Sequence, residues 1–130
     1  MAHIYRDDLI YPDLSYRIVG ILMEVNDALG AGHRERYYED AVEEGFKREG
    51  IKYKRQLYMP VVFSGKHIGK YYLDFLVEDK IVIELKRGDM FAKKNIEQVY
   101  NYLRVHNLSL SILAQFSSQG LKFKRILNTT

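Results

Sequence analysis

The sequence predicts an α/β domain in which helices flank a mixed β-sheet. Three observations support this fold class. Apolar residues recur at helical spacing in three segments, β-branched and aromatic residues dominate five others, and turn-forming residues separate most of them. Read along the chain, the expected order of elements is ααβββαββ. With 130 residues, the chain is long enough for one domain with a core of its own.

Two helices are expected before the first strand. The apolar residues between Leu14 and Leu29 form one stripe at helical spacing, and a glycine follows that segment. A second helical pattern runs from about residue 35 to residue 49 and also ends at a glycine. Residues 1–14 are polar, so we expect a flexible N-terminal arm there and a single domain over residues 15–128.

The remaining elements are mostly strands. A three-residue turn at Ser64 and another at Glu78 connect the first three of them, and one helix follows before the last two. The expected ranges are strands 51–63, 68–77 and 81–86, a helix over 91–106, and strands 108–116 and 121–127.

Composition excludes several classes of protein. The chain contains no cysteine, so disulfides, thiolate zinc sites, iron–sulfur clusters and cysteine nucleophiles are absent. The apolar runs are too short to span a bilayer. The net charge of +3 permits a polyanionic partner without requiring one. We therefore expect a cytoplasmic protein with no membrane partner and no small-molecule cofactor.

Charged residues interrupt two neighbouring apolar strands. The short turn between the strands determines which of these residues lie opposite each other. If Val77 pairs with Ile81 across the turn, Asp74 lies directly opposite Glu84. Lys86 lies two residues after Glu84 and points to the same face of the strand. The pattern predicts two neighbouring carboxylates with an ammonium group beside them.

Such a pair of acids is costly unless a cation binds it, because like charges repel and burial adds a desolvation penalty. Mg²⁺ or Mn²⁺ would remove the conflict, since hard divalent cations bind carboxylates, water and phosphate oxygens. Lys86 could then orient a water molecule or stabilise negative charge on a phosphate. This chemistry is typical of metal-assisted phosphodiester hydrolysis.

Two other interpretations of the same residues remain open. The acids could form salt bridges with Lys86 or Lys70 in a purely structural domain. The chain could also be a catalytically inactive module that binds nucleic acid or a partner protein.

Further motifs resemble a known family. The segment Gly32-His-Arg-Glu35-Arg-Tyr-Tyr38 matches the pattern of the GxxExxY protein family. The resemblance continues through Ile83-Glu-Leu-Lys86 and Gln98-x-x-x-Tyr102, and it covers about residues 15 to 128. GxxExxY proteins resemble compact members of the PD-(D/E)xK nuclease superfamily, and the Gln-x-x-x-Tyr pair resembles its RecB-like branch. The resemblance implies a restriction-endonuclease-like core.

It also implies roles for particular residues. Asp74 and Glu84 would be the main metal ligands, assisted by the Leu85 carbonyl, and Glu35 would be an additional acid. Lys86 would orient the attacking water. Leu73 stands where the superfamily often has proline before the Asp. Gln98 and Tyr102, one helical turn apart, would support the metal site and the nucleic-acid strand.

Some of these residues have simpler explanations. Glu35 could merely interact with the positive end of a helix, and the hydroxyls of Tyr38 and Tyr102 could serve packing. Basic residues near the proposed site could contact phosphate or simply be solvated. The expected partner is nucleic acid, and we expect DNA rather than RNA. A homodimer is a further possibility. The candidate nucleic-acid-binding or supporting residues are Gln98, Tyr102, Tyr38, Arg87, Lys93 and Lys94.

Overall fold

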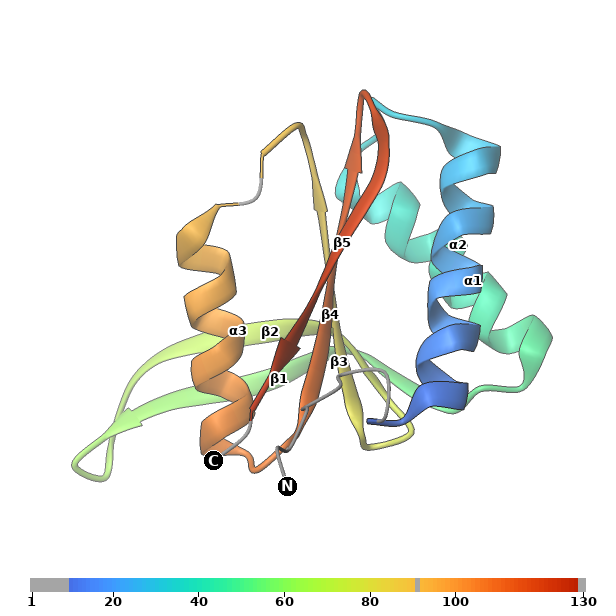
Figure 1. Cartoon of the computed structure of the whole chain (residues 1–130). Helices are drawn as coiled ribbons and strands as arrows, with labels where there is room; N and C mark the ends of the chain where they lie inside the picture. The colour runs from blue at the N-terminus through green and yellow to red at the C-terminus, as the bar shows by residue number, and fades with distance from the viewer. Residues whose placement is uncertain (1–9, 91, 129–130) are drawn as a thin grey trace, which may run out of the picture.

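The computed structural model describes residues 10–90 and 92–128 and confirms the expected element order ααβββαββ. Figure 1 shows three layers, with a five-stranded sheet between two helices on one face and one helix on the other. No helix in the described residues is long and apolar enough to cross a membrane.

The two helices on one face are α1 (Pro12–Leu29) and α2 (Glu35–Glu49). Proline in its first turn favours the start of α1, because proline lacks the N–H that a helix start leaves unpaired. Gly50 ends α2 in the left-handed region that glycine adopts without strain, at φ 67°. Helix α1 starts two residues before the expected Leu14, and residues 1–9 of the predicted arm lie outside the described part of the chain.

The sheet is mixed, as predicted. Its spatial order is β1-β2-β3-β4-β5, with β3 and β4 parallel and every other pair antiparallel. Helix α3 makes the crossover connection that a parallel pair requires. The bounds are β1 Tyr53–Phe63, β2 Lys66–Val77, β3 Ile81–Arg87, α3 Lys93–Val105, β4 Leu110–Ser117 and β5 Gly120–Leu127.

Each face of the sheet has its own apolar core. Alternate residues of the central strands pack under α1 and α2, including Ile81, Ile83 and Leu85 of β3. The intervening Val82 packs under α3 with Val99 and Leu103. Glu84 continues this second series, so a buried strand carries a carboxylate toward the α3 face.

Strands β1 and β2 form a long hairpin that projects beyond the rest of the sheet (Figure 1). Strand β2 pairs with β3 only from Phe75 to Val77, and its earlier residues, from Lys66 up to Asp74, run beside β1 alone. The candidate acids therefore lie where the hairpin separates from β3.

Candidate active site

Asp74 and Glu84 are neighbours at the point where β2 and β3 separate. The predicted register holds up to Phe75 opposite Ile83, and the next position outward is occupied by the two acids. Each carboxylate there binds the other strand's backbone. The Asp74 N–H donates to Glu84 Oε1 at 3.1 Å, and the Leu85 N–H donates to Asp74 Oδ2 at 2.7 Å. These reciprocal bonds hold two acidic side chains together.

Burial and nearby negative charge make both groups hard to ionise. Glu84 is only 2% exposed. Desolvation, followed by the negative charge of Asp74, raises the pKa of Glu84 to about 8. Desolvation also raises the pKa of Asp74 to about 6, although the hydrogen bond from the Leu85 N–H lowers it. A nearby positive charge would therefore favour the doubly ionised pair.

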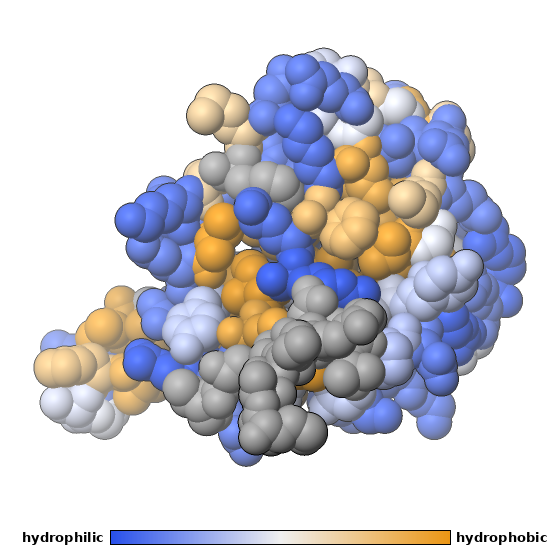
Figure 2. All heavy atoms as spheres, viewed as in Figure 1, coloured by the Kyte–Doolittle hydropathy of each residue, from blue (hydrophilic) through white to orange (hydrophobic). Residues whose placement is uncertain are grey.

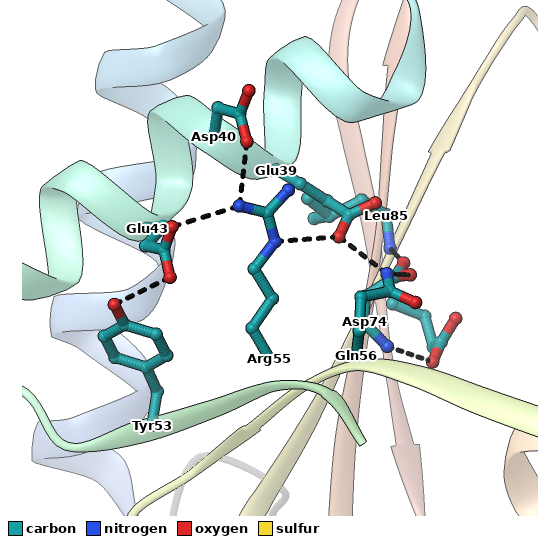
Figure 3. A network of polar contacts seen from close by, with 9 residues as sticks. Glu39, Asp40, Glu43, Tyr53, Arg55, Gln56, Asp74 and Leu85 are labelled. Atoms are coloured by element: carbon teal, nitrogen blue, oxygen red, sulfur yellow. Dashed lines mark hydrogen bonds and ion pairs between the residues drawn. The ribbon is translucent and has the colours of Figure 1, made fainter. Parts of the chain in front are cut away.

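Glu39 of α2 is a third acid at this site, and the sequence interpretation did not include it. Gln56 joins it to the pair: its amide nitrogen donates to Glu39 Oε1 at 2.7 Å and to Asp74 Oδ1 at 3.3 Å (Figure 3). Glu39 follows Glu35 by four residues, so both lie on one face of α2. That spacing was the signal available in the sequence.

Gln56 reaches this position because its backbone is unusual for a strand. It adopts φ 51°, in the left-handed region that residues other than glycine rarely enter. Before it, Arg55 points toward α2, where it binds Glu39. After it, Leu57 packs on the α3 side. The switch of face lets Arg55 and Gln56 both reach α2.

Arg55 holds the acidic face of α2 in place. Its guanidinium lies 3.3 Å from Glu39, 2.8 Å from Asp40 and 3.0 Å from Glu43 (Figure 3). Tyr53 donates a further hydrogen bond to Glu43 at 2.8 Å. The carboxylates of α2 are thus tied to β1 next to Asp74.

Lys86 and Glu35 act on the pair through charge. The Lys86 ammonium lowers the pKa of both Asp74 and Glu84, whereas the Glu35 and Glu39 carboxylates raise the pKa of Asp74. In the described part of the chain, Lys86 forms no ion pair with either acid. The same described residues show no ion pair between Lys70 and either acid.

Two tyrosines border the pair on the α3 side. Desolvation, together with the charge of the nearby Glu84 carboxylate, raises the pKa of Tyr71. Desolvation and the charge of Glu84 also raise the pKa of Tyr102, whose hydroxyl donates to Met59 Sδ at 3.4 Å. Gln98 lines one groove with both tyrosines. Tyr102 therefore lies near Glu84 on the α3 side, whereas Gln98 is placed only in the groove that it shares with the two tyrosines.

Tyr38 lies in the core. It is fully buried, its hydroxyl donates to the Gly30 carbonyl at 2.6 Å, and its ring stacks on Phe116 with centroids 4.0 Å apart. It fixes the connection between α1 and α2 against β4, so any contribution to the site is indirect. This placement agrees with the packing interpretation.

The basic candidates lie at the surface. Arg87 donates to the His33 carbonyl at 3.4 Å, close to the connection before α2. Lys93 and Lys94 are exposed in the first turn of α3, and Lys93 lies 3.8 Å from Glu97. They leave the phosphate-contact interpretation open.

The donor set fits a hard divalent cation. Asp74 and Glu84 supply carboxylate oxygens at one place, burial raises the pKa of both, and Leu85 lies beside both. Among the described residues, no three His, Cys, Asp or Glu side chains form a complete metal-binding group. A bound ion would therefore need backbone carbonyls, water or substrate oxygens as additional ligands.

Comparisons with known proteins agree with this geometry. A family model of the PD-(D/E)XK nuclease superfamily matches residues 12–126. No curated protein matches the chain. The crystal structure of SSO0001 superimposes with a TM-score of 0.50 at 12% sequence identity, covering 92% of this chain and 79% of that one, which supports the fold. The match to most of the chain, together with acids and a lysine on the expected strands, shows that the chain belongs to the PD-(D/E)XK nuclease superfamily.

Proposed function

We propose that this protein is a metal-dependent nuclease that hydrolyses phosphodiester bonds, with DNA as its expected substrate. One observation carries the proposal: Asp74 and Glu84 are buried together, with raised pKa values and Lys86 close enough to lower them. A chain that needed these residues only for stability would gain by replacing them with apolar side chains. Membership of a nuclease superfamily supports phosphodiester hydrolysis as the reaction of these residues.

Asp74, Glu84 and the Leu85 carbonyl would hold Mg²⁺ or Mn²⁺. When bound, the ion would supply Lewis acidity and neutralise phosphate charge. The residues of this chain would do the rest. The Leu85 N–H and Gln56 orient the Asp74 carboxylate, and the Asp74 N–H orients Glu84. Preorganised ligands of this kind lower the cost of reaching the reactive arrangement.

Lys86 would orient the attacking water and stabilise negative charge on the phosphate. Its ammonium already interacts favourably with both acids, so it is close enough to act on groups bound between them. Glu35 and Glu39 would act from α2 as additional acids, either through water or on a second cation.

We further propose membership of the GxxExxY family and of the RecB-like branch. Glu35 begins α2 on the same side as Asp74, as the GxxExxY pattern requires. Gln98 and Tyr102 line one groove with Tyr71, as a RecB-like Gln-x-x-x-Tyr pair would.

The proposal extends to the setting of the protein. A single domain over residues 15–128 in the cytoplasm would act on nucleic acid, with Arg87, Lys93 and Lys94 contacting phosphates. A homodimer spanning a duplex stays a prediction, and sedimentation velocity with and without DNA would measure it.

A cleavage assay tests the nuclease proposal. Purified protein is incubated with single-stranded, nicked and branched DNA in Mg²⁺, Mn²⁺ or EDTA. We expect products only with a divalent ion, and we expect Asp74→Asn, Glu84→Gln and Lys86→Met each to lower the rate by at least about a hundredfold.

Exposed residues of the same types serve as matched controls. Asp79→Asn and Lys47→Ala, whose partners are Lys54 and Glu44, should cleave at the wild-type rate. Cleavage that survives Asp74→Asn and Lys86→Met would refute the assigned site. DNA binding without cleavage in any metal would favour the catalytically inactive module instead.

A further inference from the structure

The projecting β1–β2 hairpin carries a pair of exposed tyrosines. Tyr58 and Tyr72 are cross-strand partners, with ring centroids 5.6 Å apart in an edge arrangement. They are 46% and 44% exposed, which is unusual for large aromatic residues without a covering element. In Figure 2 the hairpin projects from the body, with apolar and polar residues side by side near its end.

Basic groups surround these rings. The Lys70 ammonium lies 5.9 Å from the centre of the Tyr72 ring, and the Tyr58 hydroxyl hydrogen-bonds His67 Nε2 at 3.0 Å. Lys66 adds a further basic group at the turn of the hairpin. No acidic residue occurs between Leu57 and Leu73. The charged groups of the hairpin are therefore all basic, and they lie beside exposed aromatic and aliphatic side chains. Such a combination binds the bases and phosphates of unpaired nucleic acid.

This surface is continuous with the candidate active site. Leu57 and Met59 of the same strand pack on the α3 side, so Tyr58 and Tyr72 lie on the opposite face. Gln56, two residues before Tyr58, binds Glu39 of α2 on that opposite side and also binds Asp74. Asp74 in turn lies two residues after Tyr72. A strand that passed Asp74 could thus continue over both tyrosines.

A second copy of the chain fits the hairpin less well. Two such hairpins would bring Lys66 and Lys70 of each copy together without any acid on either hairpin to neutralise them. Pro60 removes a backbone donor from the edge strand β1, and a register shift at Val61 disturbs its pairing. Both features disfavour sheet extension.

We propose that the β1–β2 hairpin is a binding arm for single-stranded nucleic acid, with bases stacking on Tyr58 and Tyr72 and phosphates bound by Lys70. The inference rests on the proposed nuclease function and deepens it, because it specifies unpaired nucleotides beside the cleavage site. Duplex DNA hides its base faces and would gain only the phosphate contacts.

Binding measured without cleavage tests the arm separately from the chemistry. Full-length protein is titrated in EDTA into a fluorescently labelled oligothymidylate and into a duplex of equal length, and anisotropy is followed. The double variant Tyr58→Ala, Tyr72→Ala should bind the single strand at least about tenfold more weakly. The double variant with phenylalanine should bind like wild type, because the stacking faces remain. Lys70→Ala should reduce the salt dependence.

Tyr16→Ala is the matched control, since Tyr16 is 81% exposed on α1. Urea titrations verify that each variant is folded. The inference is overturned if the double alanine variant binds like wild type, if duplex binds as tightly as single strand, or if the wild type binds neither. It is also overturned if these substitutions change self-association and leave oligonucleotide binding intact. Tyrosine-dependent binding without cleavage in Mg²⁺ or Mn²⁺ would leave the arm standing and refute the nuclease proposal.

Discussion

Two acidic side chains at the fork between β2 and β3 take the place of the next backbone pair in the ladder. Each accepts a hydrogen bond from the opposite strand, so the backbone donors there remain paired. The cost is that Asp74 and Glu84 share a site with little solvent. The hydrogen bonds of the two carboxylates are therefore satisfied, but their negative charge is not neutralised. A divalent cation would neutralise it.

Asp74→Asn should stabilise the metal-free protein. The amide oxygen can still accept from the Leu85 N–H. The amide NH2 loses the long hydrogen bond from Gln56, but one of the two buried negative charges is removed. At about pH 8, we expect the free energy of unfolding to rise on the order of 1 kcal/mol, measured by urea denaturation. A loss of stability as large as that of a core truncation would contradict the strained-pair account.

The stability of the metal-free protein should depend on pH through the same two groups. Both have folded-state pKa values above their ordinary values of 3.8 and 4.5, so the folded protein binds more protons than the unfolded chain. Their contribution is present in full below those ordinary values. It is lost as pH rises through the folded-state values of about 6 and about 8.

The double variant Asp74→Asn, Glu84→Gln isolates this effect. Its unfolding free energy, compared with that of wild type by urea denaturation, should show a gap that widens between acidic and mildly alkaline pH. A gap independent of pH would mean that the pair ionises normally in the folded protein.

Residue-level prediction from the sequence succeeded where a periodic rule applied. The length of the turn correctly predicted the β2–β3 register up to Phe75 opposite Ile83, and helical spacing could also have found Glu39 from Glu35. The role of Gln56 could not be predicted, because an alternating strand pattern does not reveal a left-handed backbone in its middle. Tyr71 could not be distinguished in the sequence from the other aromatic residues of its strand.

At the scale of elements, α1 and α2 approach closely at a glycine. A Cβ atom built on Gly45 of α2 would lie 2.5 Å from Ile21 Cγ2 of α1. That distance is shorter than any ordinary contact, so a side chain at this position would push the two helices apart. Gly45 therefore sets the packing that places α2 and its acids over the sheet.

Gly45→Ala should destabilise the fold by about 1–3 kcal/mol in spite of the higher helix propensity of alanine. Gly20→Ala in α1 is the matched control, because a Cβ atom there meets nothing within 4 Å, and it should stabilise by up to about 1 kcal/mol. Thermal unfolding of both variants measures the difference. Equal effects at the two glycines would refute the close-packing argument.

Arg55 connects α2 with β1, and its loss should weaken that connection. Arg55→Ala leaves Glu39 without its cation in a largely buried place, and we expect a loss of about 2 kcal/mol, discounted for partial exposure. Arg48→Ala removes only exposed ion pairs, so we expect a clearly smaller loss of stability than at Arg55. Denaturant titration compares them, and a smaller loss at Arg55 would contradict the assigned role.

The ends of elements were less predictable than their order. Strand β1 begins at Tyr53 instead of residue 51, because the Ile51 N–H bonds the Phe46 carbonyl and completes the end of α2. A strand pattern cannot distinguish such a residue, since Ile51 is apolar and buried in either case. The periodicity of buried residues still gave every element its correct type and place in the chain.

On the scale of the whole molecule, the site arises from how the layers meet. Asp74, Glu84 and Lys86 of the proposed site come from the sheet, Glu35 and Glu39 approach Asp74 from α2, and Tyr102 of α3 lies near Glu84. The hairpin then extends away from this meeting point (Figure 1). No single element contains the site, which explains why the sequence predicted its strand residues better than its contacts across layers.

A crystal grown with Mn²⁺ tests the central claim most directly. Anomalous scattering locates manganese independently of the protein atoms. We predict a peak in contact with both Asp74 and Glu84, and its absence in a crystal of Asp74→Asn, Glu84→Gln grown in the same way. A wild-type crystal without a peak at this pair, or with manganese bound only elsewhere, would contradict the account of these acids as a cation site.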